Sequence, residues 1–312
     1  MGEYMVEFTE IASGLAFPEG PIAMEDGSVL VVEIAAERLT RIAIDGRHQH
    51  IARLPGGPNG AAIGPDGACY VCNNGGSFHY TEVDGLLFPG PTPPTHRGGS
   101  IDRVDLATGK AEAIYTHCGD IRLCGPNDIV FDRYGGFWFT DHGATADHHR
   151  RRIVTGVFYA QSDGSSIIEV IFPLDAPNGI GLSPDGGTLY VAETFTGRLW
   201  AFEVAGPGRI NPAPTLWPPH GGRLVAAPGG LTLFDSLGVD GDGHVNVATL
   251  LNGGITCAAP DGSSVEHIAT GDPLTTNICF GGADLRTAYL TLSGTGRIVS
   301  MQWPRPGLKL NY

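Results

Sequence analysis

The sequence predicts an all-β fold, a six-bladed β-propeller that comprises residues 1–312 as a single domain, with a metal site in its central channel. Three observations lead to this prediction. A unit of short apolar strands and tight turns recurs along the chain. The 47 glycines and 23 prolines are spread among these units rather than gathered in a linker. No window of ordinary helix length has an amphipathic pattern.

The clearest copy of the unit lies at residues 176–204. Residues 179–182 form a short apolar run, and Ser183-Pro-Asp-Gly-Gly187 is a turn sequence. Residues 188–192 are rich in β-branched and aromatic side chains, and residues 198–204 alternate between polar and apolar. The unit therefore indicates consecutive strands of one antiparallel sheet, with Asn178 just before the first strand.

Six copies of this unit follow one another at an irregular spacing of roughly 40 to 70 residues, which is typical of propeller blades with loop insertions. The copies begin at Phe17, Gly57, Gly125, Ala176, Phe234 and Thr276. In several copies a further pair of strands follows, joined by Asp-Gly or Thr-Gly, which is a strong hairpin signal. The strand at residues 5–12 is expected to pair near residues 299–303 and so close the ring.

Three long insertions interrupt the repeats, at residues 73–99, 142–152 and 206–228. Loops of this length in a compact β domain are often functional, so the first two are interpreted as lids. The run from His148 to Arg152 is interpreted as a solvated loop, with contact to an anionic substrate as the alternative.

Composition restricts the partners and the location. The net charge of −14 argues against nucleic acid and anionic membranes, because like charges repel. No apolar run approaches the ~20 residues that cross a bilayer, and no signal peptide is visible; a cytoplasmic location is therefore expected. The six cysteines are expected to be free thiols, and the Cys69–Cys72 pair to be strand residues.

One polar residue stands at the start of the first strand of every repeat. In a propeller these starts meet at one end of the central channel, so six side chains are expected to converge: Glu19, Asn59, Asn127, Asn178, Asp235 and Asn277. Two carboxylates and four amides without a lysine or arginine favour a hard divalent cation. The alternative is that they are turn residues, since Asn and Asp tolerate tight turns.

Several of these motifs resemble the SMP-30/gluconolactonase/LRE-like propellers. They are Phe17-Pro-Glu-Gly-Pro21, Gly125-Pro-Asn-Asp128, Ala176-Pro-Asn-Gly179 with Ser183-Pro-Asp-Gly-Gly-Thr-Leu-Tyr-Val191, and Asp235 with Gly238-Val-Asp-Gly-Asp-Gly243. The resemblance implies a small-molecule lactone as substrate. It also implies one divalent metal held by Glu19, Asn178 and Asp235, with Asn127 contacting substrate. Calcium is the favoured metal, with zinc, manganese or magnesium as alternatives.

On this resemblance, the chain is expected to be a metal-dependent lactonase in which a metal-activated water opens a sugar-acid or related lactone. Asp235 is the expected general base, and Asn59, Asn127 and His142 the expected substrate-binding residues. Two positions depart from the family pattern: Gly125 stands where sugar lactonases have arginine, and Ser236 follows Asp235 instead of glycine. An esterase or phosphotriesterase at the same metal, or a non-catalytic calcium-binding scaffold, remain alternatives.

Overall fold

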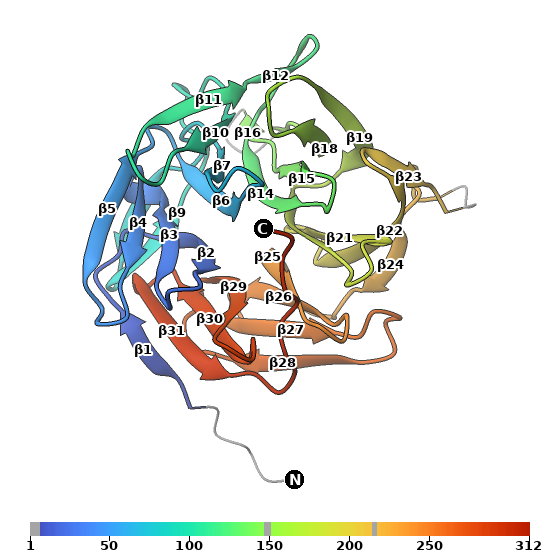
Figure 1. Cartoon of the computed structure of the whole chain (residues 1–312). Helices are drawn as coiled ribbons and strands as arrows, with labels where there is room; N and C mark the ends of the chain where they lie inside the picture. Colours follow the sequence, from blue (N-terminus) through green and yellow to red (C-terminus); the bar gives the residue numbers. More distant parts are fainter. Residues whose placement is uncertain (1–6, 147–150, 214–216) are drawn as a thin grey trace.

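A computed structural model shows a six-bladed β-propeller, with blades arranged in sequence order around a central axis (Figure 1). The structure describes residues 7–146, 151–213 and 217–312. Within these residues the only helix is a short 3-10 turn, η1 (Ile34–Ala36), so the expected absence of helices holds there. No helix in the described part of the chain is long and apolar enough to span a membrane.

Blades 1 to 3 are four-stranded antiparallel sheets. Blade 1 contains β2 (Pro18–Ala23), β3 (Val29–Glu33), β4 (Arg38–Ile42) and β5 (His48–Arg53). Blade 2 contains β6 (Pro58–Ile63), β7 (Cys69–Asn73), β10 (Ser100–Val104) and β11 (Ala111–Tyr115). Blade 3 contains β14 (Pro126–Phe131), β15 (Gly136–Asp141), β18 (Thr155–Gln161) and β19 (Ile167–Leu174).

Blades 4 to 6 complete the ring. Blade 4 contains β20 (Pro177–Leu182), β21 (Thr188–Glu193), β22 (Arg198–Gly206), β23 (Arg209–Asn211) and β24 (Arg223–Ala226). Blade 5 contains β25 (Leu233–Val239), β26 (Val245–Leu250), β27 (Gly254–Ala258) and β28 (Val265–Ala269). Blade 6 contains β29 (Thr275–Gly281), β30 (Thr287–Leu292), β31 (Arg297–Gln302) and β1 (Thr9–Ala12).

The two ends of the propeller meet in blade 6. The N-terminal strand β1 pairs antiparallel with β31, with Thr9 opposite Ser300 and Glu10 opposite Val299. The predicted ring closure is therefore confirmed, although residues 1–6 lie outside the described part of the chain. Each first strand (β2, β6, β14, β20, β25, β29) also contacts the first strands of both neighbouring blades, so these six strands surround the axis.

Large apolar side chains between adjacent blades form the core. Between blades 2 and 3, Tyr70 and Phe131 lie with ring centroids 5.1 Å apart, and Phe139 stacks on Phe158 at 5.2 Å. Burying each such side chain stabilises the fold by about 1.5–3 kcal/mol. Cys69 and Cys72 are buried in β7, and all six cysteines are free thiols, as expected.

The insertions form small hairpins. The first insertion contains β8 (Tyr80–Val83) and β9 (Leu86–Pro89), and the backbone N–H of Leu87 donates to Gly294 O in blade 6 at 2.9 Å. The loop before β14 contains β12 (His117–Cys118) and β13 (Ile121–Arg122). The second insertion contains β16 (Thr145–Ala146) and β17 (Arg151–Arg152). The prediction for residues 148–150 lies outside the described residues.

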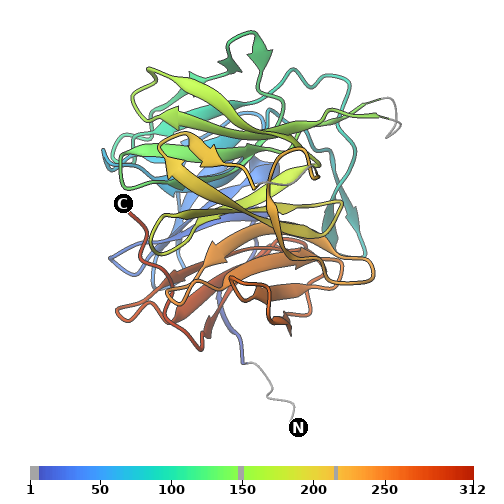
Figure 2. The same ribbon diagram turned by 90° about the vertical axis from the view of Figure 1, so that its right-hand side faces the viewer.

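The segment from Trp303 to Tyr312 crosses one end of the central axis, where Figure 1 shows the C-terminus at the centre of the ring and Figure 2 shows it on the left-hand face. Gly307 N donates to Leu285 O at 2.7 Å, and Asn311 Nδ2 donates to Phe131 O at 2.9 Å. The segment thus links blades 6 and 3 where their strands β29 and β14 end.

Candidate active site

A cavity of about 490 Å³ opens at the other end of the axis, where the first strands begin. Five of the six residues that the sequence placed there line it: Glu19, Asn59, Asn127, Asn178 and Asp235. The sixth, Asn277, is outside the lining and donates from Nδ2 to Glu19 Oε2 at 2.7 Å. Asn277 therefore orients a carboxylate rather than facing the cavity.

The backbone aims these side chains in the same way in every blade. All six first strands have a β-bulge or register irregularity at or directly beside the polar residue. Bulges commonly redirect a side chain. In three blades the next residue is glycine, and a Cβ on Gly20, Gly60 or Gly179 would lie 2.5–2.7 Å from a carbonyl oxygen of the neighbouring first strand. In these three blades, the glycine after the polar residue therefore allows the first strands to pack closely around the axis.

A second set of polar side chains fixes the turns that lead into these strands. Each stands at the end of a blade's second strand, opposite the proline that begins the first. Glu33 accepts from Ala16 N at 2.9 Å, and Asp141 accepts from Gly125 N at 2.7 Å. Asn73 and Glu193 do the same in blades 2 and 4. These residues hold the turns and do not line the cavity.

The floor of the cavity is acidic. Burial raises the pKa of Glu19 well above its usual range, and the charges of Asp235 and Asp128 add to this effect. Burial, together with the charge of Asp128, raises the pKa of Asp235 to about 7. Burial also raises the pKa of Asp128 to about 7, despite a 2.9 Å hydrogen bond from Ile129 N. Three carboxyl groups thus share one desolvated region, a situation that an added cation relieves.

The donor set fits a hard divalent cation. Glu19 Oε1 and Asn127 Oδ1 are buried and have no hydrogen-bond partner among the described residues. Asn178 donates from Nδ2 to Thr194 Oγ1 at 3.1 Å, which orients its amide. Within the described residues, no three His, Cys, Asp or Glu side chains form a metal-binding group. The expected ligand set contains only two side chains of these types, Glu19 and Asp235, because its third member, Asn178, is an amide.

Aromatic residues form much of the cavity wall. His142 lies between Phe78 and Phe195, with ring centroids 6.0 Å and 5.7 Å away. Burial, and then the charge of Arg152, lowers the pKa of His142 to about 4, so its imidazole is neutral at pH 7. Tyr80 comes from the β8–β9 hairpin and packs on Phe17 at 4.9 Å. The first two insertions therefore both contribute to the wall.

Two polar groups of the site have no chemical role predicted from sequence: the carboxyl of Asp128 and the hydroxyl of Tyr80. Tyr80 is among the aromatic residues that the sequence assigns to core or lid packing, some of them lining the pocket. Burial and the charges of Glu19 and Asp235 raise its pKa, and its hydroxyl has no partner among the described residues. At the departure from the family pattern, a Cβ on Gly125 would lie 2.6 Å from Gly143 O. The backbone therefore leaves no room for a side chain at position 125.

The fold and the site together define a six-bladed propeller with an acid-floored ligand cavity at one end of its axis. The SMP-30/Gluconolactonase/LRE-like region family matches residues 17–294, which is most of the chain. The chain belongs to this family, and the resemblance seen in the sequence is confirmed.

Curated relatives include three named hydrolases. A gluconolactonase from Zymomonas mobilis is 27% identical over 87% of this chain and 75% of its own length. A lactonase drp35 from Staphylococcus saprophyticus is 31% identical over 59% of this chain and 53% of its own length. A diisopropyl-fluorophosphatase from Loligo vulgaris is 28% identical over 60% of each. The alignments thus span between about half and three quarters of these relatives.

Solved structures show the same fold. A gluconolactonase from Xanthomonas campestris superposes with a TM-score of 0.72 at 23% identity, covering 96% of this chain and 90% of that one. The calcium-binding protein regucalcin from Agrobacterium tumefaciens gives 0.68 at 18% identity, covering 95% of each chain. These matches support the architecture of the chain and its six blades.

Proposed function

We propose that this protein is a divalent-metal-dependent hydrolase that opens a small lactone, with Asp235 as its general base. The observation that supports this most directly is the cavity floor, where the carboxylates of Glu19 and Asp235 meet amide oxygens and, among the described lining residues, Arg152 is the sole arginine or lysine and lies at the wall. The gluconolactonase and lactonase relatives support the reaction class.

Glu19, Asn178 and Asp235 would hold the metal, and calcium suits an all-oxygen donor set. The regucalcin neighbour, described as calcium-binding, is consistent with this choice. When bound, the ion supplies Lewis-acid polarisation of the lactone carbonyl. Asn277 keeps the Glu19 carboxylate oriented through its 2.7 Å hydrogen bond, and Thr194 does the same for Asn178.

The reaction adds one water across the ring ester. Asp235, which faces the cavity, accepts a proton as the water oxygen bonds to the acyl carbon. The bond between the acyl carbon and the ring oxygen then breaks, and the proton passes to that oxygen to give a hydroxy acid. Asn59 and Asn127 donate hydrogen bonds that orient the substrate, and neutral His142 packs against it without bringing a charge.

The test is a panel of lactones assayed with a pH indicator on chelator-stripped protein, with calcium, zinc, manganese or magnesium restored one at a time. We expect turnover only after a metal is restored. Turnover of every lactone at full rate in excess chelator would contradict the metal dependence. If all lactones fail while calcium still raises the melting temperature, the reaction is wrong and a calcium-binding scaffold remains.

Hydrolysis of another ester, or of a phosphotriester, is the second candidate. The diisopropyl-fluorophosphatase relative favours it, because the name of this similar protein indicates a reaction at a phosphorus centre. Including a p-nitrophenyl ester and a phosphotriester in the same panel separates the two candidates, since each should respond to the same metal but differ in kcat/KM.

A further inference from the structure

The opening of the cavity is bordered by exposed apolar side chains. Ile153, Val154, Phe195 and Leu251 line the cavity and keep between 44% and 50% of their surface exposed. They come from three blades, so their gathering at one opening does not follow from a single loop. Exposed apolar surface concentrated around a concave site is typical of a binding region for an apolar group.

Backbone strain is concentrated in the same wall. Six described residues other than glycine have positive φ, and three of them line the cavity: Phe17 (57°), Ala176 (52°) and Leu251 (66°). All three are apolar, whereas Asn or Gly adopts this conformation more easily. Leu251 stands directly before Asn252 and Gly253, yet leucine occupies the strained position and presents its side chain to the opening. Strain of this kind often accompanies function.

Several polar side chains of the wall, although not Tyr80, are engaged with one another. Thr92 and Thr145 are joined through their hydroxyl groups at 3.2 Å. Arg152 donates to Asp175 at 2.6 Å, and its guanidinium lies 4.6 Å from the centroid of Phe195. A ligand that carries many hydroxyl groups would have to compete with these pairs to obtain hydrogen bonds from the same side chains.

We infer that the substrate is a lactone with an apolar substituent, such as an alkyl chain, and not a polyhydroxylated sugar-acid lactone. This inference rests on the proposed lactonase function. The reacting ester lies on the polar floor, and the substituent extends along the wall to Ile153, Val154, Phe195 and Leu251. Each methylene that leaves water for this wall raises kcat/KM about two- to fourfold, until the chain fills the cavity.

The test compares three six-membered lactones: δ-valerolactone, δ-decalactone with its pentyl chain, and D-glucono-1,5-lactone. Each kcat/KM is divided by the hydroxide-catalysed rate constant of the same lactone, which removes differences in intrinsic reactivity. We expect at least a tenfold advantage of δ-decalactone over δ-valerolactone, and a lower value for gluconolactone. Preference for gluconolactone, or no gain from the pentyl chain, overturns the inference but leaves the lactonase function standing. If no lactone is opened, the proposed function itself has failed.

Two variants locate the apolar subsite. Leu251→Asn replaces the strained leucine with a residue that suits positive φ, so the protein should fold normally while losing apolar surface. Val154→Thr changes polarity with little change of shape. Each should lower the ratio of kcat/KM between δ-decalactone and δ-valerolactone about threefold.

The matched control is Ile44→Asn. Ile44 is 77% exposed and lies in the β4–β5 turn, outside the cavity lining. Its ratio should equal that of the wild type. A ratio unchanged in both wall variants, or lowered equally in the control, contradicts the assignment of the subsite.

Discussion

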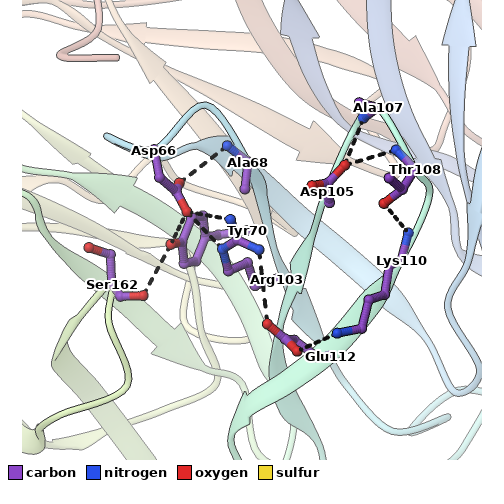
Figure 3. A network of polar contacts seen from close by, with 10 residues as sticks. All are labelled: Asp66, Ala68, Tyr70, Arg103, Asp105, Ala107, Thr108, Lys110, Glu112 and Ser162. Carbon is purple, nitrogen blue, oxygen red and sulfur yellow. Dashed lines mark hydrogen bonds and ion pairs between the residues drawn. The ribbon is translucent and has the colours of Figure 1, made fainter.

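In two acidic regions of this propeller, the pKa values of the carboxyl groups are shifted in opposite directions. On the outer part of blade 2, Asp66 lies 2.7 Å from Arg103, and Glu112 lies 3.3 Å from Lys110 (Figure 3). Burial tends to raise the pKa of Asp66, but hydrogen bonds from Arg103 and Ala68 outweigh it and hold this pKa below its ordinary value. In the cavity floor, the pKa values of the carboxyl groups are raised instead.

The difference lies in what neutralises the charge. The outer carboxylates have cationic side chains within the protein, so their negative charge is compensated on folding. Burial raises the pKa of Glu19, Asp128 and Asp235, and neighbouring carboxylates raise it further for Glu19 and Asp235. No protein cation is among the causes of these three shifts. Buried carboxyl groups whose negative charge no protein cation compensates favour the binding of a cation from solution. Four changes sharpen or break this comparison.

The largest effect is expected for Asp235→Asn. It removes the proposed base and a proposed metal ligand, so kcat for lactone opening should fall about 10³-fold, within the range of general-base catalysis. The melting temperature in excess chelator at pH 8 should not fall, because the substitution removes one of the mutually repelling charges. A variant that keeps more than a tenth of wild-type kcat contradicts the role of Asp235.

Removing the metal should make stability depend on pH in an unusual direction. Asp128 and Asp235 have pKa values of about 7 in the fold, above the ordinary ~3.9 of the unfolded chain. A raised pKa in the folded state gives stability that is present at low pH and lost as pH rises through about 7. In excess chelator, Tm at pH 8 should therefore be about 3 °C lower than at pH 5.5, which corresponds to ~2 kcal/mol.

Calcium should restore the Tm at pH 8 more than at pH 5.5. The matched control is the double variant Asp128→Asn with Asp235→Asn, in which the dependence should flatten. If the wild type in excess chelator is as stable at pH 8 as at pH 5.5, the cavity floor is not an uncompensated acidic cluster.

Tyr80→Phe should have a smaller effect. The phenol is neutral, buried and without a partner among the described residues, so it can donate a hydrogen bond to a ligand. Its loss should lower kcat/KM about three- to tenfold, the usual contribution of one neutral hydrogen bond. Tm should stay unchanged, because the ring keeps its packing on Phe17. An unaltered kcat/KM would show that the hydroxyl does not contact substrate.

The smallest effect is expected for Arg103→Gln in the outer network. The side chains of Arg103 and Asp66 are 28% and 38% exposed, and pairs of this kind contribute about 0.2–1 kcal/mol. Urea denaturation should detect at most this loss, and lactone kinetics should be unaffected. A change in kcat/KM would mean that the two acidic regions are coupled, and the comparison would fail.

The repeated features of the molecule could be predicted from sequence, and the unrepeated ones could not. Asn59 and Asn178 could be predicted because each stands at the start of the first strand of a repeat, at the same position. Asp128 follows Asn127 where three of the other blades have glycine, and nothing local indicates that it stays buried near two other acids. Tyr80 lies in an insertion whose path depends on a hydrogen bond to blade 6, formed between residues far apart in sequence.

The segment from Trp303 to Tyr312 has a kinetic consequence. It lies across the end of the axis opposite the cavity, with hydrogen bonds to Leu285 and Phe131. We therefore expect substrate to enter and product to leave by the opening at the cavity end, so that a bound product blocks the next substrate. The hydroxy acid should therefore be a competitive inhibitor, and its departure past the apolar border should slow turnover more as its substituent lengthens.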